Sequence, residues 1–227
     1  MRARDHSGLP WHTPVDKLSI RHGGSAILIK DEVAALKRER TIEAAALLFY
    51  EHGYEKTTID AIAIHMGVTK PFIYAHFKSK AQLLAEICTR GAAISLLAIN
   101  EALALEVSQI EKLRYLGRQF VVAVLENQRN IAVLTREEKH LDGPDFERLS
   151  GLRREFDRKL VQLLDHGAAD GSFHLPDTRV AALAIGGLVS WAYVWFRPHG
   201  RLTIDELAGT ISDLILALAG VRVETLA

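Results

Sequence analysis

Two helix-start signals twelve residues apart constrain the fold of this chain more than any other feature of its sequence. The stretch Thr57-Thr58-Ile59-Asp60 has the form of a capping box, in which Thr57 can accept a hydrogen bond from the backbone three residues further on. Thr69 is a second N-cap, and Pro71 follows in the first helical turn, where its missing N–H costs nothing. Gly67 ends the first of these helices. The segment 57–77 is therefore predicted to be a helix-turn-helix.

The spacing of apolar residues predicts which side chains form the core beneath this motif. A longer helix is expected from Asp31 to His52, ended by Gly53 in a left-handed cap. Its apolar residues recur at i, i+3, i+4 and i+7, namely Ile42, Ala45, Ala46 and Phe49. The first short helix presents Ile59, Ile62, Ala63 and Met66 on one face, and the second offers Ile73 and Phe77 for packing. The same segments thus provide a small core.

The rest of the chain is also predicted to be helical. A capping box at Ser79-Lys80-Ala81-Gln82 begins a further helix, and breaks are expected near 106–108, 126–130 and 141–143. Three more helices are expected: one from Pro144 to about Gly171, an apolar one from Asp177 to Phe196, and one from Thr203 to Gly220. Strand signals are essentially missing. We expect an all-α fold: a flexible arm over residues 1–30, a three-helix DNA-binding domain over 31–90, and a helical-bundle ligand-binding and dimerisation domain over 91–227.

Composition excludes several other classes. A single cysteine, Cys88, rules out an intramolecular disulfide framework and fits a reducing cytoplasm. The apolar stretch 180–196 is at the lower limit for a membrane span and is better explained as a buried helix, so no membrane partner is expected. Glu137 and His140 form one Glu-x-x-His pair, whereas a di-iron bundle needs two. We therefore predict no metal, no cofactor and no catalytic residues, and keep a helical-bundle enzyme only as an alternative.

The charge distribution favours a DNA contact at the helix-turn-helix. The chain is neutral overall, but residues 68–80 contain three lysines and no acidic residue. A short helix at this place fits the major groove, where Thr69 and Phe72 could face base edges. The predicted DNA-binding residues all lie between positions 57 and 80: Thr57, Thr58, Thr69, Lys70, Pro71, Phe72, Tyr74, His76, Lys78 and Lys80. Tyr74 could instead be a buried core tyrosine. The arm at residues 1–30, with a net charge of +3, could add contacts to phosphates or to the minor groove.

The stretch 53–83 closely resembles the signature of the TetR/AcrR family of transcriptional regulators. It contains Gly53-Tyr54, Thr57-Thr58, Gly67-Val68-Thr69 and Ile73-Tyr74, then His76-Phe77, Ser79-Lys80 and Leu83 in the order of that signature. The resemblance implies a homodimer that binds a near-palindromic operator, usually as a repressor. It also implies phosphate contacts at Tyr74, Lys80, His76 and the threonine that starts the second helix, and base readout at Lys70-Pro71-Phe72. Phe72 is bulky for its position.

The C-terminal part is similar to one subgroup of that family. Trp191-Ala192-Tyr193-Val194-Trp195-Phe196-Arg197-Pro198-His199-Gly200 resembles a segment of regulators of fatty-acid and steroid breakdown, some of which respond to acyl-CoA thioesters, and so does the stretch 134–140. An apolar or acyl-CoA-like effector is therefore expected among the helices of residues 91–171. The candidate effector residues are Arg114, Arg118, Phe120, Arg136, Trp191 and Trp195. The candidate dimer residues are Gly186, Gly187, Trp191, Trp195 and Leu214. A helical DNA-binding protein without an effector remains an alternative.

Overall fold

The computed structural model describes the backbone of residues 22–221 and the side chains of residues 30–221. Within these residues every regular element is helical, which confirms the predicted all-α class. Helix α1 (His22–His52) begins nine residues before the expected start at Asp31. Once a helix is nucleated, each added residue gains a hydrogen bond at little further cost, so a weak leader can extend it. Residues 22–30, which were expected to lie in the arm, are thus helical, and residues 1–21 lie outside the described residues.

Residues from Glu39 onward belong to one compact unit, and residues before it to another. The first part of the larger unit continues α1 and adds α2 (Ile59–Met66), α3 (Lys70–Tyr74) and the start of α4 (Lys80–Ala104). The predicted face of α1 is buried, as are Ile59, Ile62, Ala63, Ile73 and Phe77. The hydrophobic spacing of the sequence therefore identified this core correctly.

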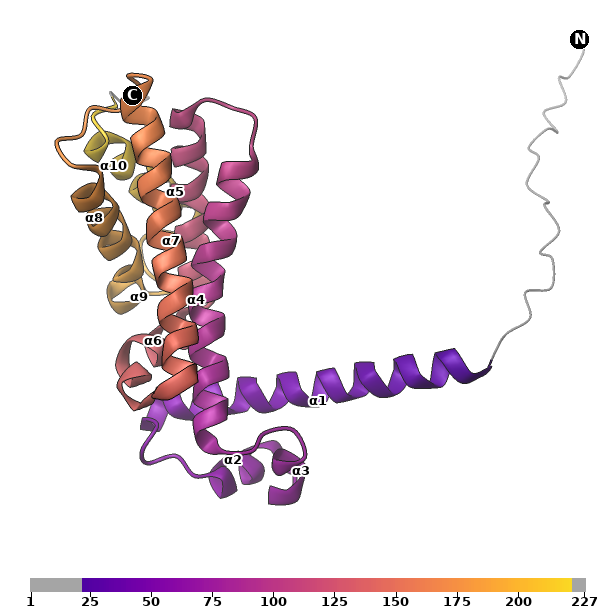
Figure 1. Cartoon of the computed structure of the whole chain (residues 1–227). Coiled ribbons are helices and arrows are strands. Elements are labelled where there is room, and N and C mark those ends of the chain that lie inside the picture. The colour runs from indigo at the N-terminus through magenta and orange to yellow at the C-terminus, as the bar shows by residue number, and fades with distance from the viewer. Residues whose placement is uncertain (1–21, 222–227) are drawn as a thin grey trace, which may run out of the picture. The chain divides into compact units, whose positions relative to one another are not determined.

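The remaining helices are α5 (Gln109–Glu126), α6 (Gln128–Glu137), the 3-10 turn η1 (Glu138–His140), α7 (Gly143–Ala169), α8 (Thr178–Ser190), α9 (Ala192–Trp195) and α10 (Ile204–Leu218). Helices α4 and α7 run side by side along the bundle (Figure 1). The expected breaks are confirmed, with one correction: the apolar helix expected to reach Phe196 ends at Ser190. A short helix, α9, follows Trp191.

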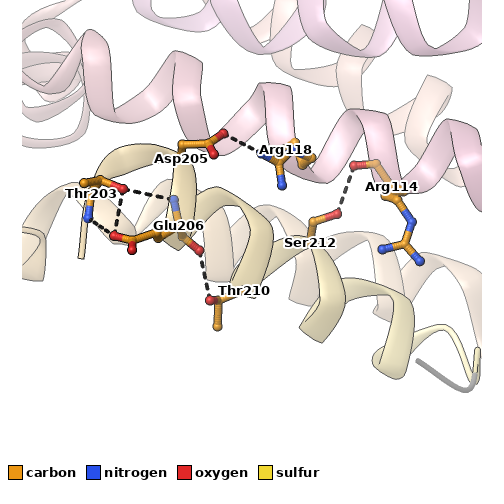
Figure 2. Close-up of polar contacts among 7 residues, drawn as sticks. All are labelled: Arg114, Arg118, Thr203, Asp205, Glu206, Thr210 and Ser212. Atoms are coloured by element: carbon orange, nitrogen blue, oxygen red, sulfur yellow. Dashed lines mark hydrogen bonds and ion pairs between the residues drawn. The ribbon is translucent and has the colours of Figure 1, made fainter. Parts of the chain in front are cut away.

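Helix α10 packs closely against α5. A capping box starts α10: the Thr203 hydroxyl accepts from the Glu206 N–H, and the Glu206 carboxylate accepts from the Thr203 N–H at 2.8 Å (Figure 2). Further along, the Ser212 hydroxyl donates to the Arg114 carbonyl at 2.9 Å. A methyl group added at Gly117 would lie 3.0 Å from the Ser212 hydroxyl oxygen. Gly117 thus permits the close approach of the two helices.

The buried apolar residues form two clusters, one in the helical bundle and one around the helix-turn-helix. One cluster belongs to the bundle of α4, α5, α7, α8 and α10. The other contains the core of α1–α4 and also Val133, Leu134, Leu141 and Leu149. The segment from α6 to the start of α7 therefore packs into the core of the helix-turn-helix, although the sequence assigned it to the second domain.

Two stretches of the described residues are long and apolar enough to cross a membrane, namely α4 and residues 178–195. Half of the α4 window is buried inside the protein, against α5, α6 and α7. Core helices of soluble proteins pass the same test, so this composition is weak support for a membrane span.

Candidate nucleic-acid interface and internal cavity

The turn between α2 and α3 has the geometry that a helix-turn-helix requires. Gly67 adopts a φ of +66°, a left-handed conformation that glycine reaches without a steric cost. Its N–H donates to the Ile64 carbonyl at 3.1 Å, and the Val68 N–H donates to the Ala63 carbonyl at 2.9 Å, which is a Schellman cap. After Val68 and Thr69, α3 begins at Lys70, with Pro71 in its first turn. The tight connection fixes α3 against α2.

Most of the predicted DNA-binding side chains lie on the exposed side of this motif. The exposed ones are Thr58, Thr69, Lys70, Pro71, Tyr74 and Lys78. Tyr74 is 48% exposed, so the alternative of a core tyrosine is wrong. Phe72 and His76 are half-buried, and their rings lie edge to face with centroids 5.6 Å apart. Ile73 and Phe77 are fully buried below them. The helix α3 therefore offers polar and aromatic groups outward from an apolar base.

Lys70 is engaged on the protein surface. Its Nζ lies 3.0 Å from the Asp60 Oδ2 on α2, and both side chains are exposed. The hydrogen bond to this carboxylate raises the pKa of Lys70. Exposed ion pairs contribute little free energy, so a phosphate can replace the carboxylate at small cost.

The structure corrects the assignment of Thr57. Thr58, not Thr57, is the N-cap of α2: its hydroxyl accepts from the Ala61 N–H at 3.0 Å. Thr57 is buried, and its hydroxyl oxygen lies 2.8 Å from the Gly53 carbonyl oxygen and 3.1 Å from that of Leu48. A hydroxyl enclosed in this way cannot reach a phosphate, so Thr57 fastens the loop to the end of α1.

Lys80 is also engaged within the protein. Its ammonium donates to the carbonyls of Tyr54 (2.8 Å), Thr57 (2.9 Å) and Glu55 (3.3 Å). The same Nζ lies 4.2 Å from the centre of the Tyr54 ring, a cation–π contact. An ammonium has three N–H donors, and these carbonyls use them. In this structure Lys80 therefore holds the loop before α2, and its ammonium is engaged there instead of standing free for the predicted phosphate contact.

A cavity of about 340 Å³ lies among α4, α5, α6, α7 and α8. Its walls include Phe120 and Phe156, whose ring centroids are 5.0 Å apart, and the small residues Gly91 and Ala92. The polar residues of the lining are Ser95, Thr135, Arg153, Asp157 and Ser190. Burial raises the pKa of Asp157, and the positive charge of Arg153 opposes this shift. The cavity is suited to an apolar ligand that also carries a polar group.

Of the predicted effector residues, Phe120 lines this cavity. Arg114 pairs with Asp213 at 2.8 Å and Arg118 pairs with Asp205, so both hold α10 to α5 (Figure 2 shows the second pair). The Arg136 guanidinium lies 5.5 Å from the centre of the Tyr50 ring. Their placement in an effector pocket is therefore corrected. The charges of Arg114 and Arg118 are paired with carboxylates at the surface.

Arg153, the basic residue that lines the cavity, was not identified from the sequence. The spacing of the apolar residues around it could have indicated this position. Leu149, Arg153, Phe156 and Leu160 follow one another at i, i+4, i+7 and i+11, which places them on one face of α7. Three of these residues are buried apolar side chains, so the charged residue on the same face lies beside the core, where its side chain is 44% exposed and lines the cavity.

Large apolar side chains are exposed on α8, α9 and α10. They are Val180, Leu183, Trp191, Val194, Trp195, Leu214 and Leu218. A methyl group added at Gly186 or Gly187 would meet nothing within 4 Å. Gly186 and Gly187 also line the cavity, as does Leu183, so this part of α8 borders the cavity as well as the apolar face. Trp191 and Trp195, 57% and 48% exposed, belong to the face and are absent from the cavity lining.

The chain is similar to known bacterial regulators along most of its length. Residues 42–87 match the family "Bacterial regulatory proteins, tetR family", and residues 106–219 match "Tetracyclin repressor-like, C-terminal domain". The transcriptional repressor KstR2 of Rhodococcus jostii is 30% identical over 79% of this chain and 89% of its own length. KstR2 of Mycolicibacterium smegmatis is 28% identical over 80% and 90%, respectively.

Solved structures agree with this result. The TetR-family regulator PfmR from Thermus thermophilus superposes with a TM-score of 0.73, at 30% identity over 78% of this chain and 97% of PfmR. AibR in complex with isovaleryl coenzyme A and operator DNA gives a TM-score of 0.71, at 25% identity over 78% and 97%. The chain therefore belongs to the TetR family and is a transcriptional regulator, not an enzyme.

Proposed function

We propose that this protein is a ligand-responsive cytoplasmic repressor, which binds a near-palindromic operator as a homodimer and is released by a small apolar or acyl-CoA-like effector. The observation that carries the proposal is an exposed recognition surface on α3 in a chain that also has a solvent-open cavity of about 340 Å³. The alternative of a DNA-binding protein without an effector leaves that cavity without a use.

The recognition surface supports specific contacts with DNA. Tyr74 and Lys78 are exposed near the C-terminal end of α3 and can reach phosphates, while Pro71 and Phe72 lie nearer its start and can face base edges. In a dimer the two copies of α3 must lie about 34–36 Å apart, or a suitable multiple, to enter successive major grooves. An effector that changes this separation would release the DNA.

The apolar face of α8–α10 supports a homodimer. Two helices from each subunit, α8 and α10, can form a four-helix interface around a two-fold axis. The replacement Leu214→Glu puts a charge on α10 within this face, at a residue that does not line the cavity, and should give a monomer in light scattering. Leu97→Glu changes a similarly exposed leucine on α4 (59% against 53% for Leu214) and should leave the dimer intact. A dimer in the Leu214 variant would contradict this interface.

The effector class is supported by the cavity walls and by the relatives. One structural neighbour is described with isovaleryl coenzyme A bound, and another, at 22% identity, as a ketosteroid regulator. An apolar group enclosed by Phe120, Phe156 and Val124 would gain from burial, roughly 25 cal/mol per Å². We infer that the acyl part of an effector occupies this space.

Fluorescence-anisotropy titration onto DNA from upstream of the protein's own gene tests the proposal. Selective binding against scrambled DNA, released by one member of an acyl-CoA panel, is the expected result. A Ser95→Phe variant, which reduces the cavity from its half-buried wall, should still bind DNA but no longer respond. Selective binding that no compound releases would favour the effector-independent alternative. Failure of an unbiased DNA selection as well would contradict operator binding.

A further inference from the structure

The 3-10 turn η1 contacts two regions of the molecule: α7, beside the cavity, and the loop that precedes α2. At its start, the Glu138 carboxylate pairs with Arg153 on α7, with 2.5 Å between Oε2 and Nη1. At its end, the His140 ring lies 5.1 Å from the Tyr54 ring, and its Nε2 lies 3.4 Å from the Glu137 Oε2. Because η1 is only three residues long, we expect a displacement of Glu138 to shift His140 as well.

Beyond His140, the contacts continue into the loop before the helix-turn-helix. The Tyr54 ring packs edge to face against Phe49, with centroids 5.3 Å apart, and lies under the Lys80 ammonium. Lys80 in turn holds the carbonyls of Tyr54 and Thr57, the residue directly before the cap of α2. The position of Tyr54 thus helps to set where α2 begins.

At the other end, the contacts begin in the cavity. Arg153 is the basic residue among those that line it within the described part of the chain. Leu134 lines the cavity as well and is buried in the core of the helix-turn-helix. A methyl group at Gly91 would lie 3.2 Å from Leu134 Cδ2, so α6 is packed tightly on α4 at this point. A ligand in the cavity therefore meets both a charged group and an apolar group that connect to α6 and η1.

We propose that Arg153 is the switch residue of this regulator: a carboxylate or phosphate on the effector takes its guanidinium from Glu138, and η1 then loosens its hold on Tyr54. The inference rests on the proposed function for its ligand and its DNA. A guanidinium can bind a carboxylate or phosphate through two parallel hydrogen bonds, so an effector anion can replace the single contact that Glu138 makes. The Arg153 side chain is 44% exposed, whereas the Glu138 Oε2 is itself buried and makes no hydrogen bond within the described residues. Loss of Arg153 would leave this carboxylate oxygen buried without a partner, which favours a displacement of η1.

A merely structural ion pair would behave differently. If the pair only stabilises the fold, its loss lowers the melting temperature and leaves the remote loop at 54–58 unchanged. If it positions η1, its loss changes the loop while the melting temperature stays nearly constant. Arg154 provides a matched control, because it is the next residue on α7 and makes an ion pair with Glu147 at 3.8 Å on the exposed surface.

Hydrogen exchange of the full-length protein tests the connection without any DNA. Glu138→Gln and Arg153→Gln should each speed amide exchange at Tyr54–Thr58 about 5-fold or more, and the double variant should add little. Arg154→Gln should leave exchange unchanged. Unchanged exchange in the Glu138 and Arg153 variants would overturn the connection whether or not the protein selects an operator. If the wild type selects no DNA, by contrast, only the proposed function fails.

The nature of the trigger is tested with two probes of equal chain length. Octanoate should speed exchange at Tyr54–Thr58 in the wild type, whereas neutral 1-octanol should not, and Glu138→Gln should abolish the response to octanoate. An equal response to both probes, or to neither, would overturn the anionic trigger. On DNA that the wild type selects, Glu138→Gln should raise the Kd about 5-fold or more in the absence of ligand.

Discussion

The ammonium of Lys80 lies 4.2 Å from the centre of the Tyr54 ring and donates to the carbonyl of the same tyrosine at 2.8 Å. One side chain thereby fixes both the ring and the backbone of Tyr54. The loop from Gly53 to Thr58 contains no regular helix of its own, so its shape depends on such contacts.

Replacement of Lys80 by methionine should therefore destabilise the protein. The variant keeps the unbranched stem but leaves up to three carbonyls without their donor, and we expect a loss of about 1.5–3 kcal/mol of unfolding free energy. Chemical denaturation measures it. Lys78→Met, an exposed neighbour, should leave stability unchanged and instead lower DNA affinity, with a salt slope reduced by about one unit. The opposite pattern would restore Lys80 as the phosphate contact.

The two adjacent threonines should respond differently to loss of their hydroxyls. Thr57→Val removes a buried hydroxyl that satisfies carbonyls at the end of α1, and should cost about 1–3 kcal/mol. Thr58→Ala removes the cap of α2 and should cost about 1 kcal/mol. Only the Thr58 change alters the exposed surface, so its effect on DNA binding should exceed its effect on folding. Equal stability losses with DNA binding unaffected in Thr58→Ala would contradict these roles.

Replacement by alanine should have opposite effects on stability at two glycines of α7, Gly167 and Gly151. A methyl group at Gly167 would lie 2.1 Å from a ring carbon of Phe173, and ring and helix cannot both keep their places. Gly167→Ala should therefore lower stability by about 1–3 kcal/mol. At Gly151 a methyl group meets nothing within 4 Å, so Gly151→Ala should raise stability by about 0.5–1 kcal/mol. Melting curves of both variants test this prediction. A higher stability of Gly167→Ala would contradict the close packing of Gly167 against Phe173.

Cys88 should be chemically inert in the folded protein. Burial, with a further contribution from the negative charge of Glu138, raises the pKa of this thiol to about 12. At pH 8 roughly one thiol in ten thousand is then ionised, and the sulfur is enclosed. Alkylation should be slow in buffer and fast in denaturant, with a rate that follows unfolding. Rapid labelling of the native protein, at a rate independent of denaturant, would show that this core opens.

The sequence alone determined the helical class, most helix boundaries and the position of the helix-turn-helix. These features depend on local interactions, because a cap joins residues three apart and an amphipathic face repeats every few residues. Ser79, Ser108 and Thr203 therefore begin helices at or beside the places where the sequence predicts a start or a break. The spacing of apolar residues also predicted which side chains of α1–α3 are buried.

Only the tertiary structure decided what the individual polar groups do. Lys80 donates to carbonyls 23 to 26 residues earlier in the chain, and Arg153 pairs with Glu138 across a turn. Arg114 and Arg118 meet carboxylates on α10. A long charged side chain can reach several partners at similar cost, so its choice depends on which elements the packed core brings near. Helix positions are fixed locally, whereas the partners of these charges are fixed by contacts between segments far apart in the sequence.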